Sequence, residues 1–177
     1  MSETVNQVFR CFACKRAGFD VEARVLLDQL RGQLGIDNLE DLFILHRYDV
    51  EGVAREVFDR ARGAVFSEPQ VDDVFDEVYA PARIPDYTLA VEALPGQFDQ
   101  RADSAAQCIQ LLAGAERPRV ACATIYGFYT LEGELSQADR DKIKGYLINP
   151  VECREASLDK PDTLAREYAA PATVETL

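Results

Sequence analysis

The sequence predicts an α+β protein in which helices cover one face of mostly antiparallel sheets. Three observations lead to this fold class. Apolar segments with the period of strands alternate with segments that have the period of helices. The order strand, helix, strand, helix, strand occurs twice within the 177 residues. Matching residues also recur at a spacing of about 80 residues, which is typical of an internal duplication.

The duplication is visible in two pairs of segments. Residues 18–35 match residues 97–114, and `RYDVEG` (47–52) matches `FYTLEG` (128–133) with a spacing two residues longer. The matched positions in the first pair are Phe19 with Phe98, Asp20 with Asp99, Ala23 with Ala102, Leu30 with Ile109 and Gly35 with Gly114. We therefore predict two copies of one unit, packed around a pseudo-twofold axis as an internal pseudo-dimer.

The first unit, 1–82, begins with a strand at 7–14, which is rich in β-forming residues. A helix follows, with Asp20 as N-cap and Gly35 just beyond its end. Strand 41–50 and a helix over residues 53–61 come next. An extended segment with a proline, 66–79, ends the unit.

The second unit, 83–157, repeats this order. It has a strand at 87–94, a helix from the N-cap Asp99 to Gly114, and a strand at 119–131. Ser136 is the expected cap of a helix over 137–148, and an extended segment, 147–158, follows. Residues 158–177 contain two prolines and have no strong period, so we predict a linker or the beginning of a further domain.

The composition excludes several classes of function. The net charge is −12 and the chain has no basic stripe, so binding to nucleic acid or to an anionic membrane is not expected. The N-terminus is polar and no apolar run approaches the roughly 18 residues of a membrane span. We therefore expect a cytoplasmic protein.

The residues that often carry chemistry favour structural roles here. Five cysteines, an odd number, argue against a disulfide framework. Cys11 and Cys14 lie three apart on a predicted strand, so their thiols should point to opposite faces as buried structural groups. His46 shares a strand face with Leu42 and Ile44, and we expect it to be packed there. The acidic run 71–77 is expected to be a solvated face rather than a metal site, and no catalytic residue or metal ligand is predicted.

The start of the second copy's long helix is the candidate site. Its first turns differ in kind from the matched turns of the first copy: the charge order is reversed, and Val21 and Val25 are replaced by polar residues. The reversal is a neutral surface change, or it marks a partner surface or an anionic ligand, since a helix N-terminus with arginine and serine nearby suits an anion. The candidate residues are Gln97, Asp99, Gln100, Arg101, Asp103 and Ser104.

Three segments carry a resemblance to a known family. They are `AVEALPGQFDQRADSAAQCIQLL` (90–112), `FSEPQVDD` (66–73) and `YLINPVECREASLDKP` (146–161). Together they resemble the N-terminal region of the large, single-chain form of phosphoribosylformylglycinamidine synthase, over nearly the whole chain. In that family the region is a tandem of two PurS-like units, which mimics the dimer of the small S subunit of multi-subunit enzymes.

The resemblance also implies a function. The family enzyme uses ATP and the amide nitrogen of glutamine to convert formylglycinamide ribonucleotide to formylglycinamidine ribonucleotide, with release of ADP, phosphate and glutamate. Its synthetase domain, which uses ATP and Mg²⁺, and its glutaminase domain lie downstream and are the implied partners. The present chain would then be non-catalytic by itself, would bind no cofactor, and would be a monomer or weak dimer. A free-standing small-molecule sensor and a dimerisation module of paired α+β units remain the alternatives.

Overall fold

The computed structural model describes residues 7–114 and 116–165. This part of the chain forms six strands and four helices, in the order expected from the sequence. They are β1 (Phe9–Lys15), α1 (Val21–Gly32), β2 (Leu39–Glu51), α2 (Arg55–Ala64), β3 (Asp72–Asp76), β4 (Tyr87–Ala93), α3 (Gln100–Ala113), β5 (Arg119–Thr130), α4 (Gln137–Leu147) and β6 (Cys153–Glu155).

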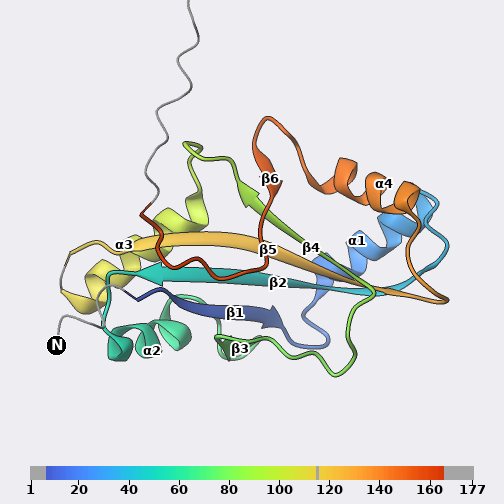
Figure 1. Cartoon of the computed structure of the whole chain (residues 1–177). Coiled ribbons are helices and arrows are strands. Elements are labelled where there is room, and N and C mark those ends of the chain that lie inside the picture. The colour runs from blue at the N-terminus through green and yellow to red at the C-terminus, as the bar shows by residue number, and fades with distance from the viewer. Residues whose placement is uncertain (1–6, 115, 166–177) are drawn as a thin grey trace, which may run out of the picture.

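The strands form one antiparallel sheet in the order β3-β1-β2-β5-β4-β6 (Figure 1). The long strands β2 and β5 pair at its centre, from Leu39 opposite Thr130 to Glu51 opposite Arg119. Each half of the chain supplies three adjacent strands, and its third strand lies at the edge of the sheet. The prediction of an α+β fold with antiparallel strands is confirmed.

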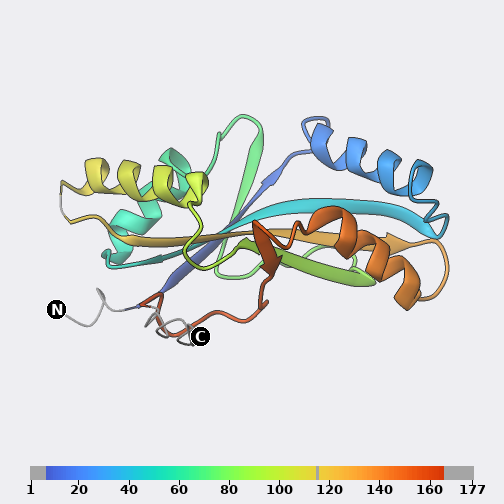
Figure 2. The ribbon, with the colours of Figure 1, turned by 90° about the horizontal axis from the view of Figure 1, so that it is seen from above.

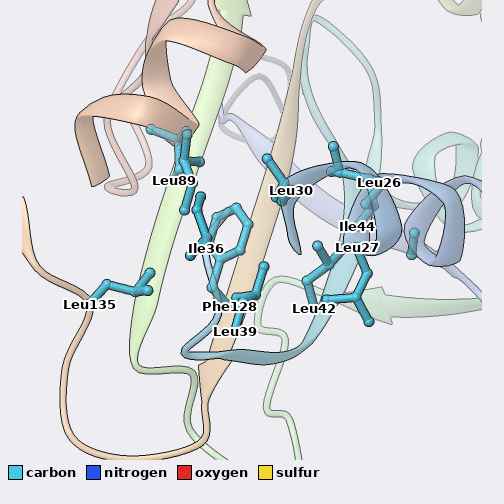
Figure 3. Packing of buried hydrophobic residues seen from close by; sticks show 12 residues of the cluster. Leu26, Leu27, Leu30, Ile36, Leu39, Leu42, Ile44, Leu89, Phe128 and Leu135 are labelled. Atoms are coloured by element: carbon cyan, nitrogen blue, oxygen red, sulfur yellow. The ribbon is translucent and has the colours of Figure 1, made fainter. Parts of the chain in front are cut away.

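The helices pack on one face of the sheet. Figure 2 shows α1, α2 and α3 on the same side, and α4 joins α1 over one half of that face. Leu30 of α1 and Ile143 of α4 are fully buried there against Phe128 of β5 and Leu89 of β4. Figure 3 shows Phe128 at the middle of this cluster. Truncation of such a leucine costs about 2–5 kcal/mol, so this cluster anchors the two helices to the sheet.

A second cluster covers the other half of the same face. Phe58 of α2 and Ile109 of α3 are fully buried in it, and Phe58 stacks on Phe9 of β1 with 5.2 Å between ring centroids. The two helix pairs, α1 with α4 and α2 with α3, therefore stand over opposite ends of the central strands.

The C-terminal segment crosses the opposite face of the sheet. Arg47 donates a hydrogen bond to the Ser157 carbonyl at 2.7 Å, and Arg10 donates one to the Leu158 carbonyl at 3.0 Å. Farther along, the buried Glu51 carboxylate accepts hydrogen bonds from the Thr163 hydroxyl and the Leu164 N–H, both at 2.8 Å. The part of the predicted linker that the structure describes, 158–165, is thus docked on the sheet. Residues 166–177 lie outside the described part of the chain.

Two details differ from the predicted duplication. Tyr48 and Tyr129 match in sequence, yet Tyr48 packs under the helices, whereas Tyr129 lies on the opposite face beside the Phe43 ring. Because side chains alternate between faces along a strand, the two long strands align one residue away from the sequence match. In addition, Asp20 makes no capping hydrogen bond; its carboxylate lies 3.3 Å from Arg24 in an ion pair.

Candidate functional site

The first turn of α3 is closed by its own N-cap. The Asp99 carboxylate accepts hydrogen bonds from the N–H groups of Arg101 (3.0 Å) and Ala102 (3.2 Å). These are two of the donors that would otherwise be free to hold an anion at a helix N-terminus. The capping carboxylate also places a negative charge there, which opposes anion binding.

The six candidate residues separate into different surroundings. Gln97, Asp99 and Asp103 line a cleft of about 930 Å³ between the β4–α3 loop and the beginning of β5. Arg101 lines another hollow, of about 570 Å³, and Gln100 and Ser104 are exposed and line neither of these two. The residues that are adjacent in the sequence therefore do not form one site.

The hollow that Arg101 enters lies over the middle of the sheet, where β1 and β2 run between the two helix pairs, and we name it the central groove. Arg101 Nη1 donates to the Tyr48 hydroxyl at 3.4 Å. The groove is also lined by carboxylates from several elements, among them Asp20 and Asp72. Burial raises the pKa of Tyr48, so its phenol stays protonated.

His46 lies in the central groove on the strand face shared with Leu42, Ile44 and Tyr48, as the sequence predicts. It is half-buried, and within the described part of the chain its Nδ1 has no hydrogen-bond partner. Burial lowers the pKa of His46 to about 4, and the positive charge of Arg101 acts in the same direction. The imidazole is therefore neutral at pH 7, a state that can accept a proton or a hydrogen bond.

The two closely spaced cysteines lie on opposite faces of β1. Cys11 is buried among the side chains under α2 and α3, whereas Cys14 is half-buried on the other face beside Phe12 and Phe43. Burial raises the pKa of Cys14 to about 11 and raises that of Cys11 as well, so both remain thiols at neutral pH. The predicted divergence of this pair is confirmed.

Asp73 and Asp76 of the acidic run are exposed, in line with the solvated face expected from the sequence, and carboxylates of the run also form ion pairs. Asp72 and Asp73 of β3 lie 3.0 Å from Lys15 and Arg16, and Asp76 pairs with Arg55. Within residues 7–114 and 116–165, no group of three or more His, Cys, Asp or Glu side chains is arranged to hold a metal ion.

An exposed apolar surface lies at the beginning of α1 and is not among the predictions from the sequence. Phe19, Val21 and Val25 are 52%, 65% and 48% exposed. The signal was present, because the buried positions Ala23, Leu26, Leu27 and Leu30 define the packed face of α1, and Val21 and Val25 fall outside it. Phe98, which matches Phe19, and Leu111 of α3 are also exposed, at 75% and 77%, so both long helices present apolar side chains to the surface.

Comparisons of the chain with models of known protein families, with curated proteins and with solved structures found no match. Within its described residues the chain has no helix that is both long and apolar enough to cross a membrane.

Proposed function

We propose that the chain is the N-terminal assembly domain of a large, single-chain phosphoribosylformylglycinamidine synthase, built as two PurS-like units. The observation that carries the proposal is the sheet order. Each copy supplies three adjacent strands, and the copies join through their equivalent long strands, β2 and β5. A fused dimer of one α+β unit has this arrangement.

In this role the domain bridges the synthetase and glutaminase domains and helps to shape the passage for ammonia between them. ATP, Mg²⁺ and the chemistry belong to those domains, and this chain alone is non-catalytic. The proposed setting is the cytoplasm, where the purine precursor is made.

The location of the resembling segments supports an interface role. The first (90–112) and third (146–161) lie side by side, because β4 pairs with β6 and Glu92 forms an ion pair with Arg154 at 3.2 Å. The second (66–73) supplies Phe66, Ser67 and Glu68 to the central groove. All three segments thus contribute to hollows in the surface. Outside them, the exposed Val25 adds apolar area of the kind that partner domains cover.

The test is reconstitution in trans. A single-chain synthase that lacks its N-terminal region is assayed for glutamine-dependent and ammonia-dependent product formation, with and without this chain. We expect the chain to restore the glutamine-dependent reaction while showing no glutaminase or ATPase activity by itself. Failure to restore it, or activity of the purified chain alone, would contradict the proposal.

Charge reversal at α3 provides a sharper version. Arg101→Glu is expected to uncouple the reconstituted enzyme, so that more glutamate is released than product formed. Arg60→Glu, at an exposed position of α2, is the matched control for the change in charge and should leave the stoichiometry unchanged. If Arg101→Glu also remains coupled, Arg101 has no part in the contact.

The central groove favours a second candidate, a free-standing small-molecule sensor. It offers Arg101, the Tyr48 hydroxyl and the neutral His46 in a hollow of about 570 Å³, which is within the usual size of ligand sites. Calorimetry with purine nucleotides separates the two functions, since a sensor binds one of them tightly without partner domains. A simple dimerisation module would instead form a stable homodimer by light scattering.

A further inference from the structure

The two copies differ at equivalent edges of their long strands. On the side of β2 that faces β1, pairing stops at Cys14 opposite Leu45. On the side of β5 that faces β4, it stops at Val91 opposite Thr124. Each long strand therefore extends beyond its neighbour, and Figure 1 shows β4 turning away from β5. Exposed strand edges of this kind can pair with another chain unless they are protected.

In the first copy the edge is sealed by side chains. The Leu42 carbonyl accepts a hydrogen bond from Arg24 Nη2 at 2.8 Å, and the Leu42 N–H donates to the Asp41 carboxylate at 2.8 Å. Arg24 and Asp41 also form an ion pair at 2.7 Å. Both backbone groups that face outward at Leu42 are thus occupied.

In the second copy the same edge is open. Asp103 stands at the position of Arg24, cannot donate to a carbonyl, and pairs with Arg117. The Phe128 carbonyl accepts a hydrogen bond from the Asp86 N–H on the β4 side of β5. Every second residue of a strand directs its backbone N–H and C=O to the same side, so Val120 and Cys122 present theirs to the β4 side as well. None of the described residues forms a hydrogen bond to them there.

The open edge forms one wall of the 930 Å³ cleft. Val120, Ala121 and Cys122 line it, opposite the loop that contains Leu94 and Pro95. From these contacts we infer that β5 is a site for strand addition, where an extended segment of a partner protein pairs antiparallel with Val120 and Cys122, in line with β4.

The walls of the cleft define the side chains of that segment. Cross-strand neighbours share a face, so the residues opposite Val120 and Cys122 lie beside Ala102 and Ala106 of α3 and are apolar. The residue opposite Arg119 lies on the other face and is acidic.

Charge complementarity supports this assignment. The Arg119 side chain is 63% exposed, and its ion pair with Glu51 is long, 3.8 Å. The Glu51 carboxylate already accepts two hydrogen bonds from the C-terminal segment. In a chain of net charge −12, an arginine in this situation favours an acidic partner residue. The open edge of β5 is present whether or not the chain has the proposed function.

The experiment is an NMR titration of the ¹⁵N-labelled full chain with a ten-residue peptide whose centre is Val-Thr-Val-Glu. We expect the amide signals of Val120 and Cys122 to shift, with no shift at the sealed edge around Leu42. Val120→Pro removes one backbone donor to the peptide and should therefore weaken binding about tenfold. The fold should be retained, because proline is tolerated at strand edges and the Val120 N–H is unused in the fold. Val120→Ala, the matched control, keeps the donor and should bind within about threefold of the wild type.

Two arms address the charge and the occupant. Replacing the peptide glutamate with glutamine should weaken binding to the wild type but not to Arg119→Gln. Absence of shifts at millimolar peptide, shifts located elsewhere, or equal binding by Val120→Pro and Val120→Ala would each overturn the proposal. Concentration-dependent self-association with the same amides affected would also overturn it, by identifying a second copy of the chain as the occupant.

Discussion

The neutral His46 makes stability depend on pH in a predictable window. Its pKa is about 4 in the folded protein, against an ordinary value of 6.5, mainly because of burial. Between these values the unfolded chain binds a proton that the folded chain does not. His46 therefore contributes its full share of stability above pH 6.5, and that share is lost as the pH falls toward 4.

The two pKa values determine the magnitude. At pH 5 the imidazole is almost fully protonated in the unfolded chain and almost fully neutral in the folded one. Linkage then predicts that this residue lowers the free energy of unfolding by about 2 kcal/mol between pH 7 and pH 5. Carboxylates also titrate at the lower end of this range, but they are common to the wild type and to His46→Gln.

Urea denaturation of both proteins at pH 7, 6 and 5 isolates the effect. The free energy of unfolding of the wild type should fall more steeply than that of His46→Gln, by about 2 kcal/mol over the range. Because the chain has one histidine, NMR titration of its ring also gives the pKa directly. Parallel pH profiles for the two proteins, or a measured pKa near 6.5, would refute the reasoning.

Other predictions concern packing, docking and capping. In urea denaturation, Gly127→Ala should lower the free energy of unfolding by about 1–3 kcal/mol, because a Cβ would overlap the Phe43 ring. The double variant with Phe43→Leu should recover part of this loss. Glu51→Gln should release the C-terminal segment, measured as faster limited proteolysis within 156–165 while the rest of the chain stays resistant. Asp99→Ala should cost about 1 kcal/mol in thermal denaturation and Asp20→Ala less, since of these two residues only Asp99 makes capping hydrogen bonds.

Local patterns in the sequence were sufficient for the elements and their order. The caps Asp99 and Ser136 were read from residue type and position, and both accept hydrogen bonds from backbone N–H groups of the helices they precede. The face of His46 followed from strand alternation. These features depend on residues close together in the chain, where periodicity and capping chemistry act directly.

The one-residue offset between the sequence match and the structural alignment of β2 and β5 could not be predicted from such local patterns. β2 is buried on both faces, with Tyr48 and Val50 on one side and Leu45 and Asp49 on the other. Its pattern therefore lacks the alternation that would show which face is which, and a one-residue slip in the repeat goes unnoticed.

Docking of the C-terminal segment also left little trace in the sequence. Arg10 and Arg47 hold it through its backbone carbonyls, which every residue possesses. The clearest indication that a segment docks on this face was the set of charged residues within apolar strands, since a buried arginine needs hydrogen-bond acceptors. The candidate residues of α3 meet different surroundings for a geometric reason: consecutive helical residues point about 100° apart, so Arg101 and Asp103, two positions apart, line different hollows.

The differences between the two proposed copies bear on why a fused pair would be useful. A homodimer must present the same surface twice, because its subunits have one sequence. Here the matched edges carry Arg24 in one copy and Asp103 in the other, and the matched helices expose Val25 in one and Ser104 in the other. Both copies still bury the same face of their long helices, so divergence is concentrated where it does not disturb packing. A domain proposed to contact two unlike neighbours needs such asymmetry, and each copy can then be altered without affecting the contact made by the other.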